Sequence, residues 1–243
     1  MIPKIIYRSW KTQNFHPKID KQIKKMLKTN PDYEQIIYTD EQIRDYIKSN
    51  YDLEIYKAFE NLTIMAAKVD FWRYLILYKK GGIYLDIDSN INSSIPDFLF
   101  KEDNALITAE TNPDLFVQWA LFFVKDHPIL ERTIELVTQN ITNNTYHNDI
   151  VNTTGPGVFT KALQDIHTKE TGERINWSNI DQNYDKKFFI NSGNNQYNYR
   201  LFGVDFNNHL SFKYKNTSYL YKDLNHWKKE ETIKDLIQDK NLN

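Results

Sequence analysis

An acidic and a basic residue on one predicted helix are the first side chains that could do chemistry together. Residues 66–80 have the most regular helical pattern in the chain, and Asp70 and Arg73 lie three residues apart within it. Residues at this spacing share a helix face, so the two side chains can form a hydrogen-bonded pair. The pair presents an acceptor and a cationic donor side by side, although an ordinary helix ion pair would have the same spacing.

Two carboxylates follow directly after this helix. Gly81-Gly82 ends the helix and lets the chain turn into a short strand, which we predict over residues 83–87. Because side chains alternate along a strand, Tyr84, Asp86 and Asp88 are expected to lie on one face. Open α/β sheets bind ligands beyond the carboxyl ends of their strands, so these carboxylates mark the predicted centre of a site.

Two such carboxylates are suited to a hard divalent cation, Mg²⁺ or Mn²⁺, held together with the phosphates of a substrate. We expect Asp88 to hold the metal, which would act as a Lewis acid on a diphosphate leaving group. Arg73 adds a second positive charge for the same oxygens, and the remaining carboxylate can accept hydrogen bonds from ribose or sugar hydroxyls. On this hypothesis the catalytic residues are Asp70, Arg73, Asp86 and Asp88.

An Asp-x-Asp pair by itself also occurs in other settings. Most such pairs are solvated acids in loops. Only the combination of the Asp-x-Asp pair with Asp70, Arg73 and the two glycines favours a functional site. A calcium-binding EF-hand loop is excluded because its sixth and twelfth positions would be Ile91 and Asp97 instead of Gly and Glu. Two alternatives stay open: a haloacid-dehalogenase-type phosphohydrolase with Asp86 as its nucleophile, and a non-catalytic sugar-nucleotide-binding module.

Composition limits the classes of protein that the chain can represent. Its 243 residues include 31 Lys and Arg against 32 Asp and Glu, and this balance argues against nucleic acid as a partner. The absence of cysteine excludes disulfides, thiolate metal ligands and thiol catalysis. No apolar run approaches the roughly 20 residues of a membrane span, and no signal peptide is recognised. We therefore expect no membrane span and a cytoplasmic location.

The order of predicted elements is typical of one α/β domain in which helices cover a mostly parallel sheet. Strands are predicted over residues 2–7, 34–38, 83–87, 105–109 and 197–204. Helices are predicted over residues 19–27, 41–48, 53–59, 66–80, 117–124, 129–139, 159–166 and 227–242. Asp40 is the predicted N-cap of the second helix, and residues 143–152 are predicted to form a loop.

The combined pattern resembles the DXD-containing, sugar-binding glycosyltransferases of the Och1-like mannosyltransferase and capsular-polysaccharide group. It is similar, more distantly, to the glucosyltransferase domains of the large clostridial toxins. The residues that match the family's helix and Asp-x-Asp segment are Ala66, Asp70, Arg73, Gly81, Gly82, Tyr84, Asp86 and Asp88. Residues 2–10 resemble the family's opening strand with Tyr7 in place of the usual His, and residues 154–156 resemble its Thr-Gly-Pro turn.

The resemblance implies which residues contact the donor and the metal. The implied nucleotide-sugar contacts are Ser9, Trp10, Met65, Asp70, Arg73, Tyr84, Asp86 and Ile87. Trp10 is implied to stack on the base, although a core Trp would fit the same position. Asp86, Asp88 and His226 are the implied metal ligands, but the family's closing His-x-x-x-Ser-Trp pattern is not intact around His226. The segment from about Asn225 through Trp227 is implied to close over the diphosphate.

The resemblance also implies a fold and a reaction. The fold would be of the GT-A type, a single domain over residues 1–243. Residues 1–100 would form the nucleotide-sugar half and residues 101–243 the acceptor half with its closing segment. The reaction would be the transfer of a hexose from a UDP- or GDP-sugar to a hydroxyl of a glycan or another acceptor. The family implies dependence on Mn²⁺ or Mg²⁺, retention of anomeric configuration and a role in polysaccharide biosynthesis.

Overall fold

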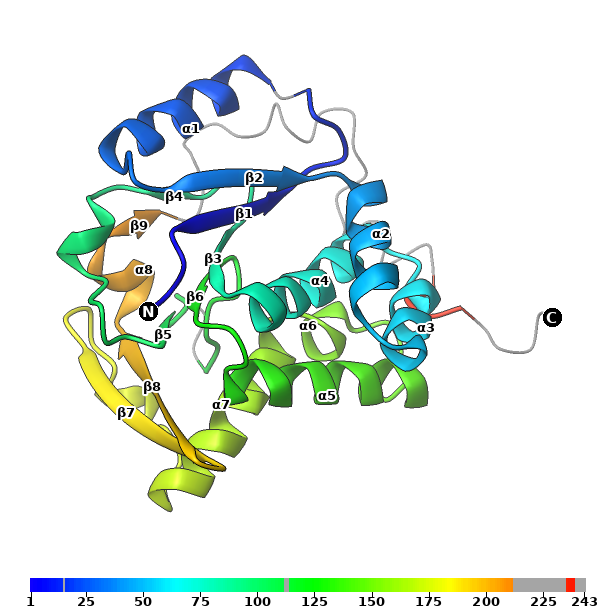
Figure 1. Cartoon of the computed structure of the whole chain (residues 1–243). Helices are drawn as coiled ribbons and strands as arrows, with labels where there is room; N and C mark the ends of the chain where they lie inside the picture. Colours follow the sequence, from blue (N-terminus) through cyan, green and yellow to red (C-terminus); the bar gives the residue numbers. More distant parts are fainter. Residues whose placement is uncertain (15, 112–113, 212–234, 239–243) are drawn as a thin grey trace.

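The computed structural model has one large sheet with helices packed around it, and it describes residues 1–14, 16–111, 114–211 and 235–238 (Figure 1). Seven strands form this sheet in the order β2-β1-β3-β6-β5-β8-β7. They are β1 (Ile5–Ser9), β2 (Glu34–Tyr38), β3 (Gly82–Leu85), β5 (Ala105–Thr108), β6 (Ala120–Phe123), β7 (Asp185–Ser192) and β8 (Asn195–Phe202). The short strands β4 (Asn90–Ile91) and β9 (Leu210–Ser211) pair with each other.

The helices of the described chain cover both faces of the sheet. They are α1 (Pro17–Thr29), α2 (Asp40–Asn50), α3 (Leu53–Asn61), α4 (Met65–Lys80), α5 (Pro128–Asn143), α6 (Ile150–Thr153), α7 (Pro156–Thr171) and α8 (Val204–Asn207). Single 3₁₀ turns span Ile95–Asp97 and Trp177–Asn179. None of the helices in these described ranges combines the length and the hydrophobicity needed to cross a bilayer.

The predicted α/β class is confirmed, but the sheet is mixed instead of mostly parallel. Within the described chain, β1 runs parallel to β2 and β3, and β5 runs parallel to β8. The pairs β3–β6, β5–β6 and β7–β8 are antiparallel. Strand β6 reverses the direction because it lies between β3 and β5 and runs against both.

Strand β6 replaces the helix that the sequence predicts over residues 117–124. Leu121 and Phe123 pack with α4, α5 and α7 on one face, whereas Ala120 and Phe122 pack with α1, β4 and α8 on the other. A strand that is buried on both faces has a continuous apolar sequence without alternation. Such a run cannot be told from a buried helix by periodicity, which explains why the prediction was wrong.

Helix α4 and its end at the two glycines form as predicted. The helix is buried over most of its length, and it ends at Gly81, whose φ is 66°. At Gly82, φ is 115° and a Cβ atom would lie 2.9 Å from the carbonyl oxygen of Ile5 and 3.0 Å from the Tyr7 ring. Only glycine accepts both the positive φ and this close approach, so Gly82 lets β3 lie directly against β1.

Three local predictions differ from the structure. The N-cap of α2 is Thr39 and not Asp40, because the Thr39 hydroxyl and the Gln42 side chain each bond the other residue's backbone N–H in a capping box. The predicted loop over 143–152 contains the last residue of α5 and the first turn of α6. Strand β7 was not predicted, and its mostly exposed or half-buried pattern explains why.

The predicted tail helix over residues 227–242 lies mostly outside the described residues. Of this range, residues 235–238 are described, and they are not helical. Leu236 and Ile237 are buried there, and Ile237 forms an isolated antiparallel bridge with Leu62. The backbone N–H of Thr63 donates to the carbonyl of Leu236 at 2.9 Å. This part of the tail is therefore docked beside the start of α4.

Candidate active site

The Asp-x-Asp segment forms a turn immediately after β3. The strand ends at Leu85, where the sequence predicts that it continues to residue 87. The backbone N–H of Ser89 donates to the carbonyl of Asp86 at 3.0 Å, which closes a turn over Asp86–Ser89. The expected alternation of Tyr84, Asp86 and Asp88 on one strand face is therefore wrong for Asp88, whose position is set by the turn.

A buried arginine on β1 holds this turn. Arg8 is fully buried, and its Nη1 donates to the backbone carbonyls of Asp86 and of Ser89, the latter at 3.0 Å. The Arg8 Nε donates to the Gln35 side chain on β2 at 2.9 Å, which fixes the direction of the guanidinium group. One cation thus binds the carbonyl oxygens at both ends of the Asp-x-Asp turn.

Arg73 joins the helix acid to the first acid of the turn. Its Nη2 lies 3.0 Å from Oδ1 of Asp70 and 3.2 Å from Oδ1 of Asp86. Its Nη1 donates to the backbone carbonyl of Gln118 at 3.2 Å, and its Cζ lies 4.5 Å from the centroid of the Tyr84 ring. The Arg73 Nε is buried without a hydrogen-bond partner in the described part of the chain. A buried donor of this kind indicates a partner that those residues do not supply.

Asp70 is held in a polar pocket of its own. The Gln118 amide donates to Asp70 Oδ1 at 3.1 Å, and the Thr154 hydroxyl donates to Oδ2 at 3.4 Å. Burial raises the pKa of Asp70 to about 6, although Arg73 and these two hydrogen bonds act in the opposite direction. Thr154 belongs to the predicted Thr-Gly-Pro turn, which the structure places against the site.

Asp86 is more open than Asp70. Its side chain is 29% exposed, and the Tyr84 hydroxyl donates to its Oδ1 at 2.7 Å. Arg73 also bonds this Oδ1, and none of the described residues donates a hydrogen bond to Oδ2. Ser9 at the end of β1 lies near Tyr84 and acts to lower the pKa of its phenol, although the larger effect of burial raises that pKa well above its usual value.

The two carboxylates of the turn fit a divalent cation that is shared with a diphosphate. Asp86 and Asp88 are hard oxygen donors two residues apart, and Oδ2 of Asp86 receives no hydrogen bond from the described chain. Among the described residues, no group of three or more His, Asp or Glu side chains is arranged to hold a metal. Mg²⁺ in such sites is usually bound by one or two carboxylates together with substrate phosphates, which matches this donor set.

The other residues that are predicted to contact the donor or the metal are Trp10, Ile87, Met65 and His226. Trp10 is half-buried and packs with Ile87, the middle residue of the Asp-x-Asp turn, in a small apolar cluster with α1. Met65 is the first residue of α4 and precedes Asp70 by five residues, or about 7.5 Å of helix. His226 and the predicted closing segment lie outside the described residues.

Two contacts of the site were missed in the sequence. Arg8 and Gln118 both bind site groups, and they come from β1 and from the loop before β6. Arg8 directly follows the strand predicted over residues 2–7, and nothing in its sequence context indicates that its side chain is buried. Gln118 lies in an irregular segment, and nothing in its sequence context indicates its contact with Asp70.

Comparisons with known proteins concern the same segment of the chain. Residues 17–113 match the family model for a glycosyltransferase sugar-binding region containing a DXD motif. The matched range contains the Asp-x-x-Arg helix, the two glycines and the Asp-x-Asp turn. The predicted resemblance to DXD-containing glycosyltransferases is confirmed.

Similar proteins include fungal mannosyltransferases. Inositol phosphoceramide mannosyltransferase 3 of Schizosaccharomyces pombe is 29% identical over 191 residues, which cover 76% of this chain and 52% of that protein. An initiation-specific alpha-1,6-mannosyltransferase of Candida albicans is 27% identical over 200 residues, which cover 66% of this chain and 52% of that protein. The chain therefore spans about half the length of these relatives.

A solved structure shows the same architecture. The structure titled PaToxG Glycosyltransferase aligns with a TM-score of 0.57 and 23% sequence identity, covering 70% of this chain and 72% of its own. This likeness confirms the predicted GT-A type fold, with its mixed sheet and flanking helices.

Proposed function

We propose that the chain is a glycosyltransferase that moves a hexose from a UDP- or GDP-sugar to a hydroxyl of a glycan or another acceptor. The observation that carries this proposal is the bridge that Arg73 makes between Asp70 and Asp86 beside the Asp-x-Asp turn. The relatives are named as mannosyltransferases, so mannose is the first sugar to test. The acceptor classes that their names suggest are glycans and inositol phosphoceramide lipids.

The buried guanidinium of Arg73 is suited to the diphosphate of the donor. Its Nε is the donor atom without a partner among the described residues, and arginine binds phosphate oxygens with its planar set of N–H groups. The hydrogen bonds to Asp70 and Asp86 keep the group in place before the substrate arrives, so that little reorganisation is needed during reaction.

The carboxylates have separate roles in this proposal. Asp70 accepts hydrogen bonds from sugar hydroxyls, because its oxygens are held in place by Gln118 and Thr154. Asp86 and Asp88 would hold a Mn²⁺ or Mg²⁺ ion, with His226 as a third candidate ligand. When bound, the metal neutralises the charge that develops on the leaving diphosphate. Trp10, next to Ile87, provides an aromatic surface for the base.

Ligand-dependent thermal stabilisation tests the donor proposal directly. The melting temperature is measured with UDP- and GDP-sugars, with and without Mn²⁺, because a ligand that binds only the folded state raises it. One metal–donor pair is expected to stabilise the wild type, whereas Asp88→Asn should lose both this effect and metal-dependent transfer. Full transfer by Asp88→Asn would contradict the model, and donor binding without hydrolysis or transfer would indicate a non-catalytic binding module.

Retention of configuration is also part of the proposal and has its own test. The product of transfer to a simple acceptor is examined by proton NMR, which distinguishes the α from the β linkage. An α-linked product from an α-linked donor is expected. A β-linked product would leave the transferase function in place and overturn retention. Trapping of a phosphoryl group on Asp86 would instead favour the phosphohydrolase alternative.

A further inference from the structure

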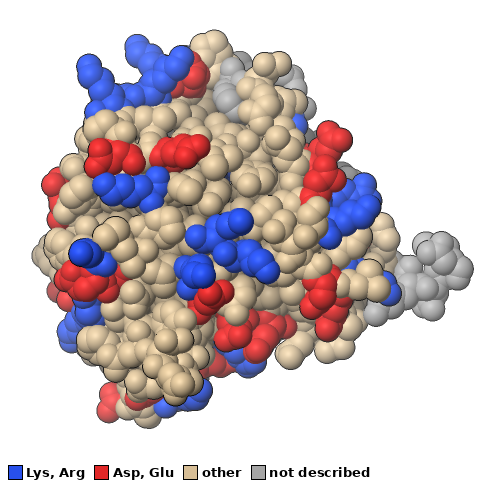
Figure 2. Space-filling view, viewed as in Figure 1, with Lys and Arg blue, Asp and Glu red and all other residues tan. Residues whose placement is uncertain are grey.

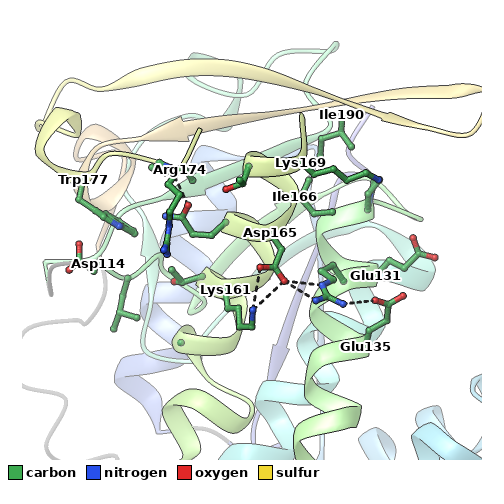
Figure 3. A pocket seen from close by; sticks show the side chains of 18 of the residues that line it. Asp114, Glu131, Glu135, Lys161, Asp165, Ile166, Lys169, Arg174, Trp177 and Ile190 are labelled. Carbon is green, nitrogen blue, oxygen red and sulfur yellow. Dashed lines mark hydrogen bonds and ion pairs between the residues drawn. The ribbon is translucent and has the colours of Figure 1, made fainter. Parts of the chain in front are cut away.

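A large open groove lies beside helices α5 and α7, and it has no role in the mechanism described above. It has a volume of about 1620 Å³ and is lined by α5 and α7, by the loop at Asp114 and by the 3₁₀ turn at Trp177. Figure 3 shows Trp177, Arg174 and Asp114 at one end and the charged side chains of the two helices at the other. Pockets for compact small molecules are usually about 300–1000 Å³, so this groove suits a longer ligand.

The charges in the groove are balanced, and half of them form ion pairs with one another. Its lining has four basic and four acidic side chains. Arg132 Nη2 lies 2.8 Å from Asp165 Oδ2, and Lys161 Nζ lies 3.3 Å from Asp165 Oδ1. On the face shown in Figure 2, basic and acidic side chains are likewise interspersed. A polyanion would require a basic excess, whereas a neutral chain of hydroxyl groups can use donors and acceptors of both kinds.

The packing of Trp177 fixes the orientation of its aromatic ring in the wall of the groove. Its ring packs on the buried Phe116 with centroids 4.4 Å apart, and the residue is half-buried while it lines the groove. In Figure 3, Arg174 projects into the groove beside Trp177. An aromatic ring combined with nearby polar groups suits a ligand that has both apolar faces and hydroxyl groups, as sugar rings do.

Two segments of the chain run from the groove to the candidate active site. Leu115 lines the groove and precedes Gln118, which bonds Asp70 and Arg73, by three residues. Gly157 lines it as well and follows Thr154, the other partner of Asp70, by three residues. Three residues of extended chain span at most about 11 Å, so the groove begins close to the reacting region.

We propose that this groove binds the acceptor, and that the acceptor is a neutral oligosaccharide. The inference rests on the proposed transferase function and names its second substrate class. All of its lining residues lie between Asp114 and Ser192, after the range that matches the sugar-binding family model. The groove and the DXD segment thus come from separate parts of the chain, and Gln118 and Thr154, which bond Asp70, each lie three residues from a residue of the groove lining.

The chain has no cysteine, so a single introduced thiol can be used to block the groove. Arg174→Cys is modified with a polyethylene-glycol maleimide, and Lys48→Cys, at an exposed position on α2, is the labelled control. The probes are manno-oligosaccharides of two to six units and malto-oligosaccharides of the same lengths. Binding is measured by isothermal titration calorimetry without donor. Donor hydrolysis is measured separately.

Labelled Arg174→Cys is expected to lose oligosaccharide affinity by at least about tenfold, with donor hydrolysis unchanged. Labelled Lys48→Cys should bind like the wild type. Trp177→Ala should lose affinity and Trp177→Tyr should recover part of it, because the tyrosine ring replaces the aromatic surface. The proposal is overturned if the blocked variant binds the oligosaccharides normally, or if the wild type binds neither series. Failure of the wild type to bind or hydrolyse any donor would count against the transferase function itself.

Discussion

The guanidinium of Arg8 donates hydrogen bonds to the backbone carbonyl of Asp86, although the two residues are 78 positions apart. The same Nη1 also reaches the carbonyl of Ser89, so the bonds restrain both ends of the turn that carries the two carboxylates. Backbone carbonyls do not titrate, and the restraint therefore holds at any pH at which the protein is folded. Strand β1 is in this way coupled to the candidate metal site without a side-chain carboxylate between them.

Replacing Arg8 by Gln should destabilise the fold and weaken metal binding together. The variant loses hydrogen bonds from a buried charged group, each of which contributes about 1.5–3 kcal/mol, so we expect the free energy of unfolding to fall by about 3 kcal/mol. Chemical denaturation gives the stability, and Mn²⁺ titration followed by electron paramagnetic resonance gives the affinity. Arg44→Gln removes an exposed arginine that is paired with Glu60 and should change neither quantity appreciably. Unaltered Mn²⁺ affinity in Arg8→Gln would show that the turn keeps its shape without Arg8.

The features predicted correctly from the sequence are those with local causes. Helix α4, its end at Gly81 and the Asp-x-Asp after the next strand depend on spacing within some 25 residues. The pairing of the Asp70 and Arg73 side chains could be predicted because positions three apart on a helix must share one face. Local sequence was therefore sufficient to locate the centre of the candidate site.

The features that were missed depend on pairing between distant segments. Strand β6 has an apolar run that suits a helix equally well, and only its position between β3 and β5 makes it a strand. The contact of Gln118 with Asp70 spans 48 positions, and that of Thr154 with Asp70 spans 84. The periodicity of the sequence does not indicate such contacts, because they form only when the sheet and the loops around it assemble.

Arg73→Lys should impair catalysis far more than the conserved charge suggests. The guanidinium uses two nitrogens to reach Asp70, Asp86 and the Gln118 carbonyl, whereas a lysine has a single ammonium group. We expect kcat/KM to fall by about 10- to 100-fold, the size of one lost charge-assisted hydrogen bond. Steady-state kinetics with the preferred donor provides the measurement, with Arg44→Lys as the matched control. Wild-type kinetics in Arg73→Lys would assign Arg73 a structural role only.

Trp10→Ala should raise the donor KM more than it lowers kcat. Trp10 is half-buried beside Ile87, and stacking on a base would stabilise the bound donor and the transition state about equally. Trp10→Phe keeps an aromatic face and should retain most of the affinity. Because Trp10 also packs on α1, the melting temperature of each variant is measured alongside. A lowered melting temperature with an unchanged KM would place Trp10 in the core and remove it from the donor site.

Asp70 should give stability and donor binding opposite dependences on pH. Burial raises its pKa from an ordinary value of 3.8 to about 6 in the folded protein. Between these values the folded state keeps a proton that the unfolded state has lost, so the contribution of Asp70 to stability falls as pH rises. The fall amounts to at most about 3 kcal/mol and ends above the folded pKa. The ionised form prevails only above that pKa, and it is the form that pairs with Arg73.

The test compares wild type with Asp70→Asn in metal-free buffer from pH 4 to 7. The free energy of unfolding of the variant should rise relative to that of the wild type across this range, because Asn does not titrate. Asp45→Asn, which removes an exposed carboxylate on α2, serves as the control for the loss of a charge. Donor affinity of the wild type, measured separately with Mn²⁺ present, should weaken as pH falls through about 6. A constant difference between the two unfolding curves would mean that Asp70 does not titrate in this range. Loss of stability and of donor affinity together on acidification would point to general acid unfolding instead.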